Sequence, residues 1–124
     1  MMVNVMEGFV KKSLLFDFYG ELLTEHQRRI YQEILFDDFS ISEVARDEGI
    51  SRQGVHDMVR RCERTLEDYE ERLHLVERFL KIRDAISRIF ALTGSAAGDA
   101  TDAGDEKERM RQIAKIAEEI RREL

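Results

Sequence analysis

The sequence contains no proline, a single cysteine and only 7 glycines in 124 residues. Proline interrupts helices and glycine weakens them, so their scarcity, with 37% charged residues, favours long solvated helices over a sheet. The lone Cys62 excludes an intrachain disulfide and a thiolate metal cluster, and the nearby Val59 and Leu66 predict an inert buried thiol. We therefore expect an all-α protein.

Long apolar runs are also missing. No run reaches the roughly 18 residues that a membrane-spanning helix needs, and the N-terminal MMVNVMEGFVKK lacks the ordered regions of a signal peptide. We expect a cytoplasmic protein without a membrane partner. The three histidines lack ligand-spaced cysteines or carboxylates, and no phosphate loop or nucleophile elbow occurs. The sequence thus predicts no enzyme activity, metal or cofactor.

The most informative segment that is present runs from Ser40 to Arg64. Ser40 and Glu43 make the S-x-x-E capping box that starts a helix, and Gly49 suits the left-handed conformation that ends one. Ser51 occupies the next N-cap position. Two short helices joined by a tight turn are the layout of a helix-turn-helix. Helical spacing predicts a buried face made of Ile41, Val44, Ala45, Val55, Met58, Val59 and Cys62.

Further helices are predicted on both sides of this motif. The first runs from about residue 10 to 23, and a second opens with the Thr24–Gln27 capping box. Their buried sides are predicted to hold Leu14, Leu15, Phe18, Tyr19, Leu22, Ile30, Tyr31, Ile34 and Leu35. Val44, Ala45, Ile50 and Val55 of the motif are expected to meet the helices that carry Phe18 and Ile34.

The sequence divides into four segments. Residues 1–66 are expected to form the helix-turn-helix domain and residues 67–92 a long helical extension. Residues 93–105 have three glycines and no large apolar side chain, which predicts a flexible linker, and residues 106–124 form an amphipathic C-terminal helix. We expect the last helix to fold back on residues 75–92, the alternative being a partner-binding or surface helix.

Candidate nucleic-acid contacts lie on the second helix of the motif. Arg52 and Gln53 could read guanine and adenine edges, and Arg60 and Arg61 could hold phosphates. Exposed arginine and glutamine are also ordinary helix surface, so both interpretations stay open. The predicted nucleic-acid-binding residues are Ser51, Arg52, Gln53, His56, Arg60, Arg61 and Arg64.

The net charge of −6 opposes strong nucleic-acid binding, because phosphate neutralisation supplies most of the affinity. Residues 1–66 hold 9 Lys and Arg against 12 Asp and Glu, and residues 67–124 hold 11 against 14. Residues 51–64 are locally basic, with four arginines against Asp57 and Glu63. A monomer is therefore expected to bind weakly.

A homodimer would partly offset this charge and cover apolar surface. A heptad stripe continues the motif's second helix to about Leu80, farther than the preceding short helices can cover, with a bend or break near His74. The predicted dimer interface is Leu66, Tyr69, Leu73, Val76, Phe79 and Leu80. The expected pairing is two-fold over residues 66–92, and the alternative is an intrachain hairpin closed by residues 106–123.

Four blocks resemble the YlxM family of bacterial helix-turn-helix proteins: LFDFYGELLT (15–24), DDFSISEVA (37–45), ISRQGVHDMVRR (50–61) and LEDYEERLHL (66–75). The resemblance departs at Gly54, where the family more often has alanine, and does not extend beyond residue 93. It implies an all-α fold with a tri-helical core like sigma-factor region four and winged helices, followed by a long C-terminal helical extension.

The resemblance also implies a function. YlxM proteins are associated with the operon of the signal recognition particle, which points to a DNA-binding regulator or accessory of that pathway, with particle components as partners. The alternative is a protein–protein adaptor that binds a secretion-pathway GTPase or its RNA without binding DNA. A sigma factor itself is not expected, because the sequence offers no second domain for polymerase docking.

Overall fold

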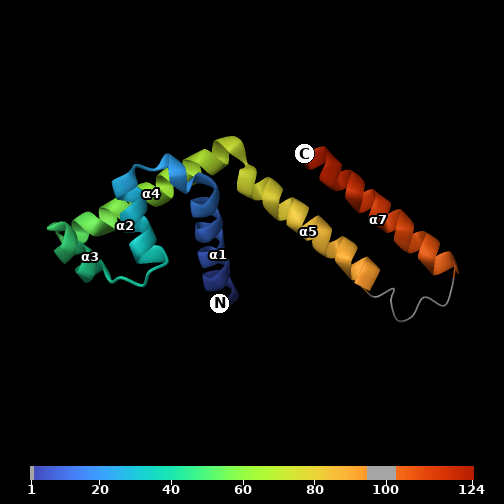
Figure 1. Ribbon diagram of the computed structural model, residues 1–124, viewed down its shortest axis with the longest axis horizontal. Helices are drawn as coiled ribbons and strands as arrows, with labels where there is room; N and C mark the ends of the chain where they lie inside the picture. Colours follow the sequence, from blue (N-terminus) through green and yellow to red (C-terminus); the bar gives the residue numbers. More distant parts are fainter. Residues whose placement is uncertain (1, 95–102) are drawn as a thin grey trace. The chain divides into compact units, whose positions relative to one another are not determined.

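The computed structural model describes residues 2–94 and 103–124, and every element in these residues is a helix. The predicted all-α fold class is confirmed. The chain divides into two compact units, Met1–Val76 and Glu77–Leu124. In chain order the elements are α1 (Met2–Tyr19), η1 (Gly20–Leu22), α2 (Glu25–Leu35), α3 (Ile41–Glu48), α4 (Arg52–Leu73), α5 (Leu75–Gly94) and α7 (Ala103–Glu123), as labelled in Figure 1.

Side-chain caps fix the starts of α2, α3 and α4, but of the two predicted capping boxes only the one at α2 is complete, because at Ser40 the return bond from the Glu43 side chain is not formed. At α2 the capping box is reciprocal: the Gln27 N–H donates to Thr24 Oγ1 over 3.1 Å, and Gln27 Oε1 accepts from the Thr24 N–H over 3.2 Å. Ser40 and Ser51 each accept a hydrogen bond from the backbone N–H three residues later, over 3.1 and 3.0 Å. These bonds satisfy donors that a helix start otherwise leaves unpaired.

The turn of the motif has the predicted geometry. Gly49 ends α3 with φ 67°, in the left-handed region that favours glycine. The Ile50 N–H then donates to the Ala45 carbonyl over 3.0 Å, which closes the end of α3. The next helix, α4, begins at once behind the Ser51 cap. Helices α2, α3 and α4 thereby make the predicted tri-helical arrangement.

One buried cluster holds this arrangement together. It contains Ile30 of α2, Val44 and Ala45 of α3, and Val55 of α4, none of them more than 6% exposed. Burying a valine or isoleucine stabilises a fold by about 1.5–3 kcal/mol. Small Ala45 lets α3 approach its neighbours closely, so this cluster sets how α3 and α4 cross.

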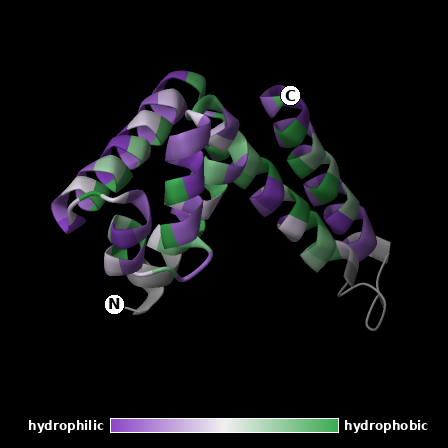
Figure 2. Cartoon of the chain, turned by 60° about the vertical axis from the view of Figure 1, so that its left-hand side comes forward, coloured by the Kyte–Doolittle hydropathy of each residue, from purple (hydrophilic) through white to green (hydrophobic). Residues whose placement is uncertain are grey.

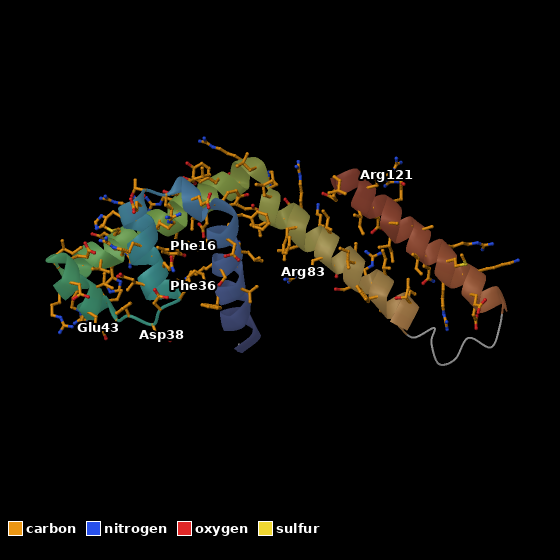
Figure 3. All side chains as sticks on the ribbon, in the orientation of Figure 1. Phe16, Phe36, Asp38, Glu43, Arg83 and Arg121 are labelled. Atoms are coloured by element: carbon orange, nitrogen blue, oxygen red, sulfur yellow. The ribbon has the colours of Figure 1, made fainter. Side chains whose placement is uncertain are left out.

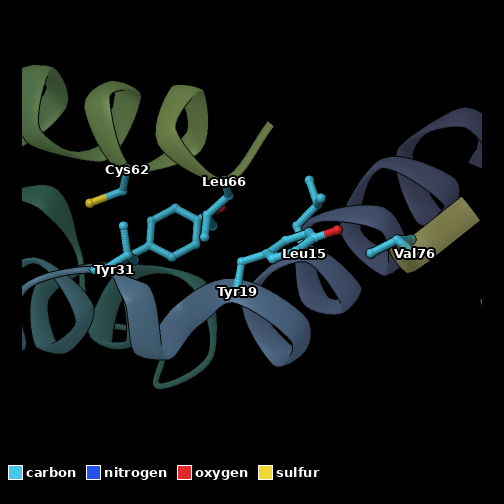
Figure 4. Close-up of a cluster of buried hydrophobic side chains, with 7 residues drawn as sticks. Leu15, Tyr19, Tyr31, Cys62, Leu66 and Val76 are labelled. Carbon is cyan, nitrogen blue, oxygen red and sulfur yellow. The ribbon is translucent and has the colours of Figure 1, made fainter. Parts of the chain in front are cut away.

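A second cluster joins α1 to α2, α4 and the start of α5. It contains Leu15, Tyr19, Leu23, Tyr31, Cys62, Leu66 and Val76, most of which are labelled in Figure 4. Cys62 is fully buried, as predicted, and burial raises the pKa of its thiol to about 11. The thiolate form that reacts is therefore disfavoured at neutral pH.

Aromatic contacts fix α1 against the C-terminal end of α2. The ring of Phe36 lies 5.3 Å from that of Phe16 and 6.3 Å from that of Phe9, measured between centroids. Phe16 also lies 5.8 Å from the ring of Tyr31. Figure 3 labels Phe16 and Phe36, which face each other between the two helices. Tilted and edge-to-face pairs of this kind add favourable quadrupole interactions to apolar burial.

The chain breaks between α4 and α5, at the predicted position. His74 takes φ 57°, and its N–H donates to the Glu70 carbonyl over 2.8 Å. The Tyr19 hydroxyl donates to Glu70 Oε1 over 2.6 Å and accepts from the Leu75 N–H over 3.1 Å. Glu70 Oε1 also accepts from the Val76 N–H over 2.9 Å. Helix α4 therefore ends at Leu73, and the stripe that runs on to about Leu80 belongs to two helices, because this polar joint satisfies the start of a new helix.

The first predicted helix differs in its bounds and in its buried face. It begins at Met2, because Gly8 costs a helix only about 1 kcal/mol and does not end it as proline would. It ends at Tyr19, where the chain tightens into the 3-10 helix η1. Leu23 follows η1 in an extended conformation and is buried, whereas Leu22 is 54% exposed, so the prediction that Leu22 is buried is wrong.

Two further core predictions are wrong. Phe18 is 38% exposed, because α1 turns Leu15 and Tyr19 toward α4 instead. Ile50 is 40% exposed, because it belongs to the surface turn between α3 and α4. Ile34 does pack against the cluster that contains Val44 and Val55.

The second unit is a helical hairpin. Helices α5 and α7 run side by side in opposite directions (Figure 1), and Ala85 and Ile116 are buried. Arg88 Nη1 lies 3.0 Å from Glu119 Oε2, and Lys81 Nζ lies 3.9 Å from Glu123 Oε1. The last helix thus folds back on residues 77–94, as expected.

The predicted linker over residues 93–105 is shortened at both ends. Helix α5 continues to Gly94, and α7 begins at Ala103, where Asp105 and Glu106 suit the positive end of the helix dipole. The rest of the predicted linker, residues 95–102, lies outside the described residues. None of the described helices combines the length and apolar character needed to cross a lipid bilayer.

Replacing Ala45 by glutamate should unfold the first unit. The side chain is 6% exposed at a helix crossing, and an unpaired buried carboxylate there should cost about 4 kcal/mol or more, a large part of a small domain's stability. Circular dichroism during heating measures the loss. The exposed Ser42→Glu in the same helix is the control, and a cooperative wild-type transition in Ala45→Glu would contradict the placement of α3.

Tyr19→Phe should destabilise the first unit by about 1–3 kcal/mol in a denaturant titration, because it removes the donor to Glu70 and the acceptor for the Leu75 N–H. Tyr31→Phe is the matched control. Tyr31 is equally buried, but its hydroxyl has no hydrogen-bond partner among the described residues. Equal effects of the two substitutions would show that the joint contributes no stability.

Candidate nucleic-acid interface

The predicted recognition residues lie on the outer side of α4. Val55, Cys62 and Leu66 turn one side of this helix into the core. All seven predicted contact residues are exposed: Ser51, Arg52, Gln53, His56, Arg60, Arg61 and Arg64. The separation of a buried and an exposed side is therefore as predicted, while a role in nucleic-acid contact stays a prediction.

The structure gathers some of these residues and separates others. Gln53, His56, Arg60 and Arg64 recur every three or four positions and so share one face of α4. Arg61 lies about 100° around the helix from Arg60. A surface that used both arginines would therefore spread over two neighbouring sides of the helix, as phosphate strands on both sides of a groove require.

The N-terminus of α4 adds its own attraction for anions. Ser51 satisfies the Gly54 N–H, and its carbonyl accepts from the Val55 N–H over 3.2 Å. The N–H groups of Arg52 and Gln53 belong to the first turn, which has no intrahelical acceptors. Together with the helix dipole, such groups attract phosphate oxygens.

Gln53 is held in place by a neighbour on its own helix. Its Nε2 donates to Asp57 Oδ1 over 3.0 Å, one turn farther along α4. This bond orients the amide but brings a carboxylate beside the proposed groove-facing residues. Sequence reasoning noted the charge of Asp57 and missed the bond, although the i,i+4 spacing could have indicated it.

Charge is distributed unevenly along α4. Residues 52–64 contain four arginines against Asp57 and Glu63, whereas residues 65–73 contain four carboxylates against Arg72. The acidic C-terminal half repels phosphate. Contact with phosphate would therefore favour the N-terminal half, which is the half that helix-turn-helix proteins use to reach bases.

A surface ion-pair group ties α2 to the end of α3. Glu48 Oε2 lies 2.9 Å from His26 Nε2, and Glu48 Oε1 accepts from Arg29 Nη2 over 2.7 Å. The hydrogen bond with His26, and then that with Arg29, hold the pKa of Glu48 below its usual value. These contacts span about twenty positions, so no local pattern could have predicted them.

The residues predicted for a dimer interface fall into two groups. Leu66 and Val76 are buried in the core of the first unit, and Tyr69 stacks on Tyr19 with ring centroids 6.0 Å apart. Side chains already covered by their own chain cannot line an interface, which corrects this part of the prediction. Leu73, Phe79 and Leu80 are between 37% and 45% exposed and stay predicted interface residues.

The capped tri-helical fold, with its exposed, locally basic second helix, defines a helix-turn-helix protein. The chain belongs to the family described as "UPF0122: Putative helix-turn-helix protein, YlxM / p13 like", whose family model matches residues 6–98. This family is described by its helix-turn-helix and not by an enzymatic activity. Among the described residues, no three His, Cys, Asp or Glu side chains lie where they could hold a metal ion.

Similar proteins carry the same family name. A UPF0122 protein of Thermoanaerobacter sp. (strain X514) is 39% identical over 118 residues, which cover 95% of this chain and 94% of the relative. The UPF0122 protein of Desulforamulus reducens is 37% identical over 120 residues, 96% of this chain and 100% of the relative. A UPF0122 protein of Bacillus cereus (strain AH187) is 31% identical over 116 residues, 94% and 99% of the two chains. The similarity therefore includes α7, beyond the segment matched by the family model.

Acidification should weaken the α2–α3 contact. Because its partners lower the folded-state pKa of Glu48, its stabilisation is complete above the unfolded-state pKa of about 4.3 and is lost as the pH falls through the folded-state pKa. Glu48→Gln should therefore lose less stability than wild type below about pH 5. The difference should stay under about 1 kcal/mol, because the pair is solvent-screened. Denaturant titrations at several pH values measure it.

Glu25→Gln is the control for this titration, because Glu25 is exposed on α2 and has no ion pair among the described residues. Parallel acid profiles of wild type and Glu48→Gln would show that the ion-pair group contributes nothing.

Proposed function

We propose that this protein is a DNA-binding regulatory protein that places the N-terminal half of α4 in the major groove. The observation that carries the proposal is the capped and locally basic N-terminal half of α4, whose outer side is exposed behind a tight helix-turn-helix turn. In this arrangement Arg52 and Gln53 face base edges, and Arg60 and Arg61 hold phosphates. RNA is the other nucleic acid that the same groups could contact.

The charge distribution sets the strength of this binding. Residues 1–76 hold 10 Lys and Arg against 16 Asp and Glu, so the unit that contains the motif has a net charge of −6. Affinity should therefore be modest and strongly salt-dependent. The logarithm of the binding constant should fall linearly with the logarithm of the salt concentration, with a slope of about −0.9 per neutralised phosphate. Two motifs in one assembly would double the number of phosphate contacts.

The double substitution Arg60→Ala/Arg61→Ala should weaken binding to all DNA sequences, by roughly tenfold or more at low salt. It should also reduce the salt slope by about 2, because two phosphate contacts are lost. Fluorescence anisotropy across a salt series measures both. Arg111→Ala/Arg122→Ala changes the net charge equally on the exposed surface of α7 and should leave the slope unchanged.

Arg52→Ala should act differently, lowering discrimination between sequences by about 1–3 kcal/mol while leaving nonspecific binding nearly intact. A selection from random DNA supplies the preferred sequence for this comparison. If wild type binds neither DNA nor RNA at low salt, the DNA-binding proposal is wrong.

The regulated pathway follows from the YlxM resemblance. We infer that the protein serves as a regulator or accessory of signal recognition particle targeting, which makes the promoter of the operon that encodes the chain the first DNA to test. Preference for this promoter over a shuffled sequence of equal composition would support the assignment. Equal affinity for the two would contradict it.

The acidity of residues 1–76 supports a second candidate, a protein–protein adaptor without DNA binding. A basic partner, or the GTPase of the particle with its RNA, would then occupy the motif. Size-exclusion chromatography with the purified GTPase and RNA distinguishes the two candidates. A complex that survives Arg60→Ala/Arg61→Ala, in a protein that fails to bind DNA, would favour the adaptor.

A further inference from the structure

Helix α5 is apolar over a wider arc than its partner helix covers. Ala85 lies against α7 and is 3% exposed, and Ile82 and Ile89 beside it are half-buried. Ile86 and Phe90 lie next to this contact stripe on the same helix but are 43% and 70% exposed. Figure 2 shows hydrophobic residues recurring along the helix. Half of the apolar arc of α5 is therefore open.

Helix α7 likewise carries apolar side chains that its partner helix does not cover. Ile116 is 5% exposed against α5, whereas Met110 is 69% exposed and Ala117 is exposed as well. Leu124 follows at the same interval and is 91% exposed. The spacing of seven residues places these three side chains in one row along the helix.

The open rows of the two helices lie on one side of the hairpin. In each helix the open residues lie about a quarter turn beyond the contact residues, in the direction in which the chain winds. Because the two helices are antiparallel, they wind in opposite directions when viewed from one end. The two quarter turns therefore lead to the same side of the hairpin. A shallow groove lined partly by Leu92 and Ile113 opens on this side. We call the surface of Ile86, Phe90, Met110, Ala117 and Leu124 the hairpin face.

The opposite side of the hairpin is polar. It carries the ion pairs Arg88–Glu119 and Lys81–Glu123, and these four residues with Asp84 make up five of the eight that line a second groove there. The hairpin is thus amphipathic as a whole. This is the pattern of half a four-helix bundle, in which a pair of helices buries one common face against a second pair.

The size of the hairpin face fits a dimer. At about 200 Å² for a fully exposed large side chain, its four large residues expose on the order of 500 Å² per copy. A stable interface buries about 800 Å² per partner. The polar rim around the hairpin face would supply the area that these apolar side chains do not. A patch of this extent is at the upper end of what monomers expose.

Charge favours a second copy over other occupants. Residues 77–124 contain 10 Lys and Arg against 10 Asp and Glu, so two hairpins meet without net repulsion. An anionic lipid surface, in contrast, is bound by helices with an excess of basic residues on the polar side. The electroneutral hairpin lacks this excess.

We propose that two copies of this chain associate through the hairpin face, so that α5 and α7 of each copy complete a four-helix bundle. The pairing is two-fold, because one self-complementary patch closes the assembly. The proposal goes beyond DNA binding and does not depend on it. It replaces Leu66, Tyr69 and Val76, which their own chain covers, by other residues of α5 and α7.

The test is sedimentation equilibrium of the full chain over a wide concentration range. Wild type should sediment at twice the 14.6 kDa chain mass. The variant Ile86→Asp/Phe90→Asp should sediment at 14.6 kDa, with a dissociation constant raised about a hundredfold or more. The control Arg111→Glu changes the net charge by the same two units on the outer side of α7 and should stay dimeric.

Circular dichroism is the folding control. Each variant should keep the first unit folded, because Ile86 and Phe90 belong to the second unit. Met110→Asp tests the other helix independently and should also give monomers. A monomeric wild type, or a dimer that survives both apolar-to-aspartate variants, overturns the proposal. A wild-type monomer that binds phosphatidylglycerol vesicles would identify a lipid occupant and overturn it too.

Discussion

The Tyr19 hydroxyl and the Glu70 carboxylate meet over 2.6 Å, and the break between α4 and α5 depends on this pair. The Tyr19 hydroxyl accepts a hydrogen bond from the Leu75 N–H, and the Glu70 carboxylate accepts one from the Val76 N–H. The start of a new helix would otherwise leave these N–H groups unpaired. The break in turn places Val76 in the core of the first unit. From residue 77 onward α5 needs other apolar surface to cover it, and α7 supplies only part of that surface.

The acidic half of α4 contributes to the same joint. Glu70 lies within the acidic segment of residues 65–73, so part of the acidity that would oppose phosphate binding is used to end one helix and start the next. The basic start of α4 has no such structural duty: its arginines are exposed and face away from the core. Under the proposed function, stability and recognition are therefore divided between the two halves of one helix.

Local signals predicted much of the fold. The caps at Thr24, Ser40 and Ser51 and the left-handed Gly49 depend on neighbouring residues alone, so sequence spacing was sufficient to find them. The outward side of α4 followed from helical periodicity for the same reason.

The wrong predictions concern side chains whose burial depends on residues far away in the sequence. A heptad stripe does not show whether its own chain or a second copy covers it, and Tyr19 and Leu15 of α1 cover Leu66 in this chain. The two units differ in the size of their hydrophobic cores. The first unit buries two clusters of apolar side chains, whereas in the described part of the second unit the buried apolar side chains are Ala85 and Ile116. A hairpin of this size is marginal alone. If a second copy supplies the missing cover, the stability of α5 and α7 depends on protein concentration while that of the helix-turn-helix does not.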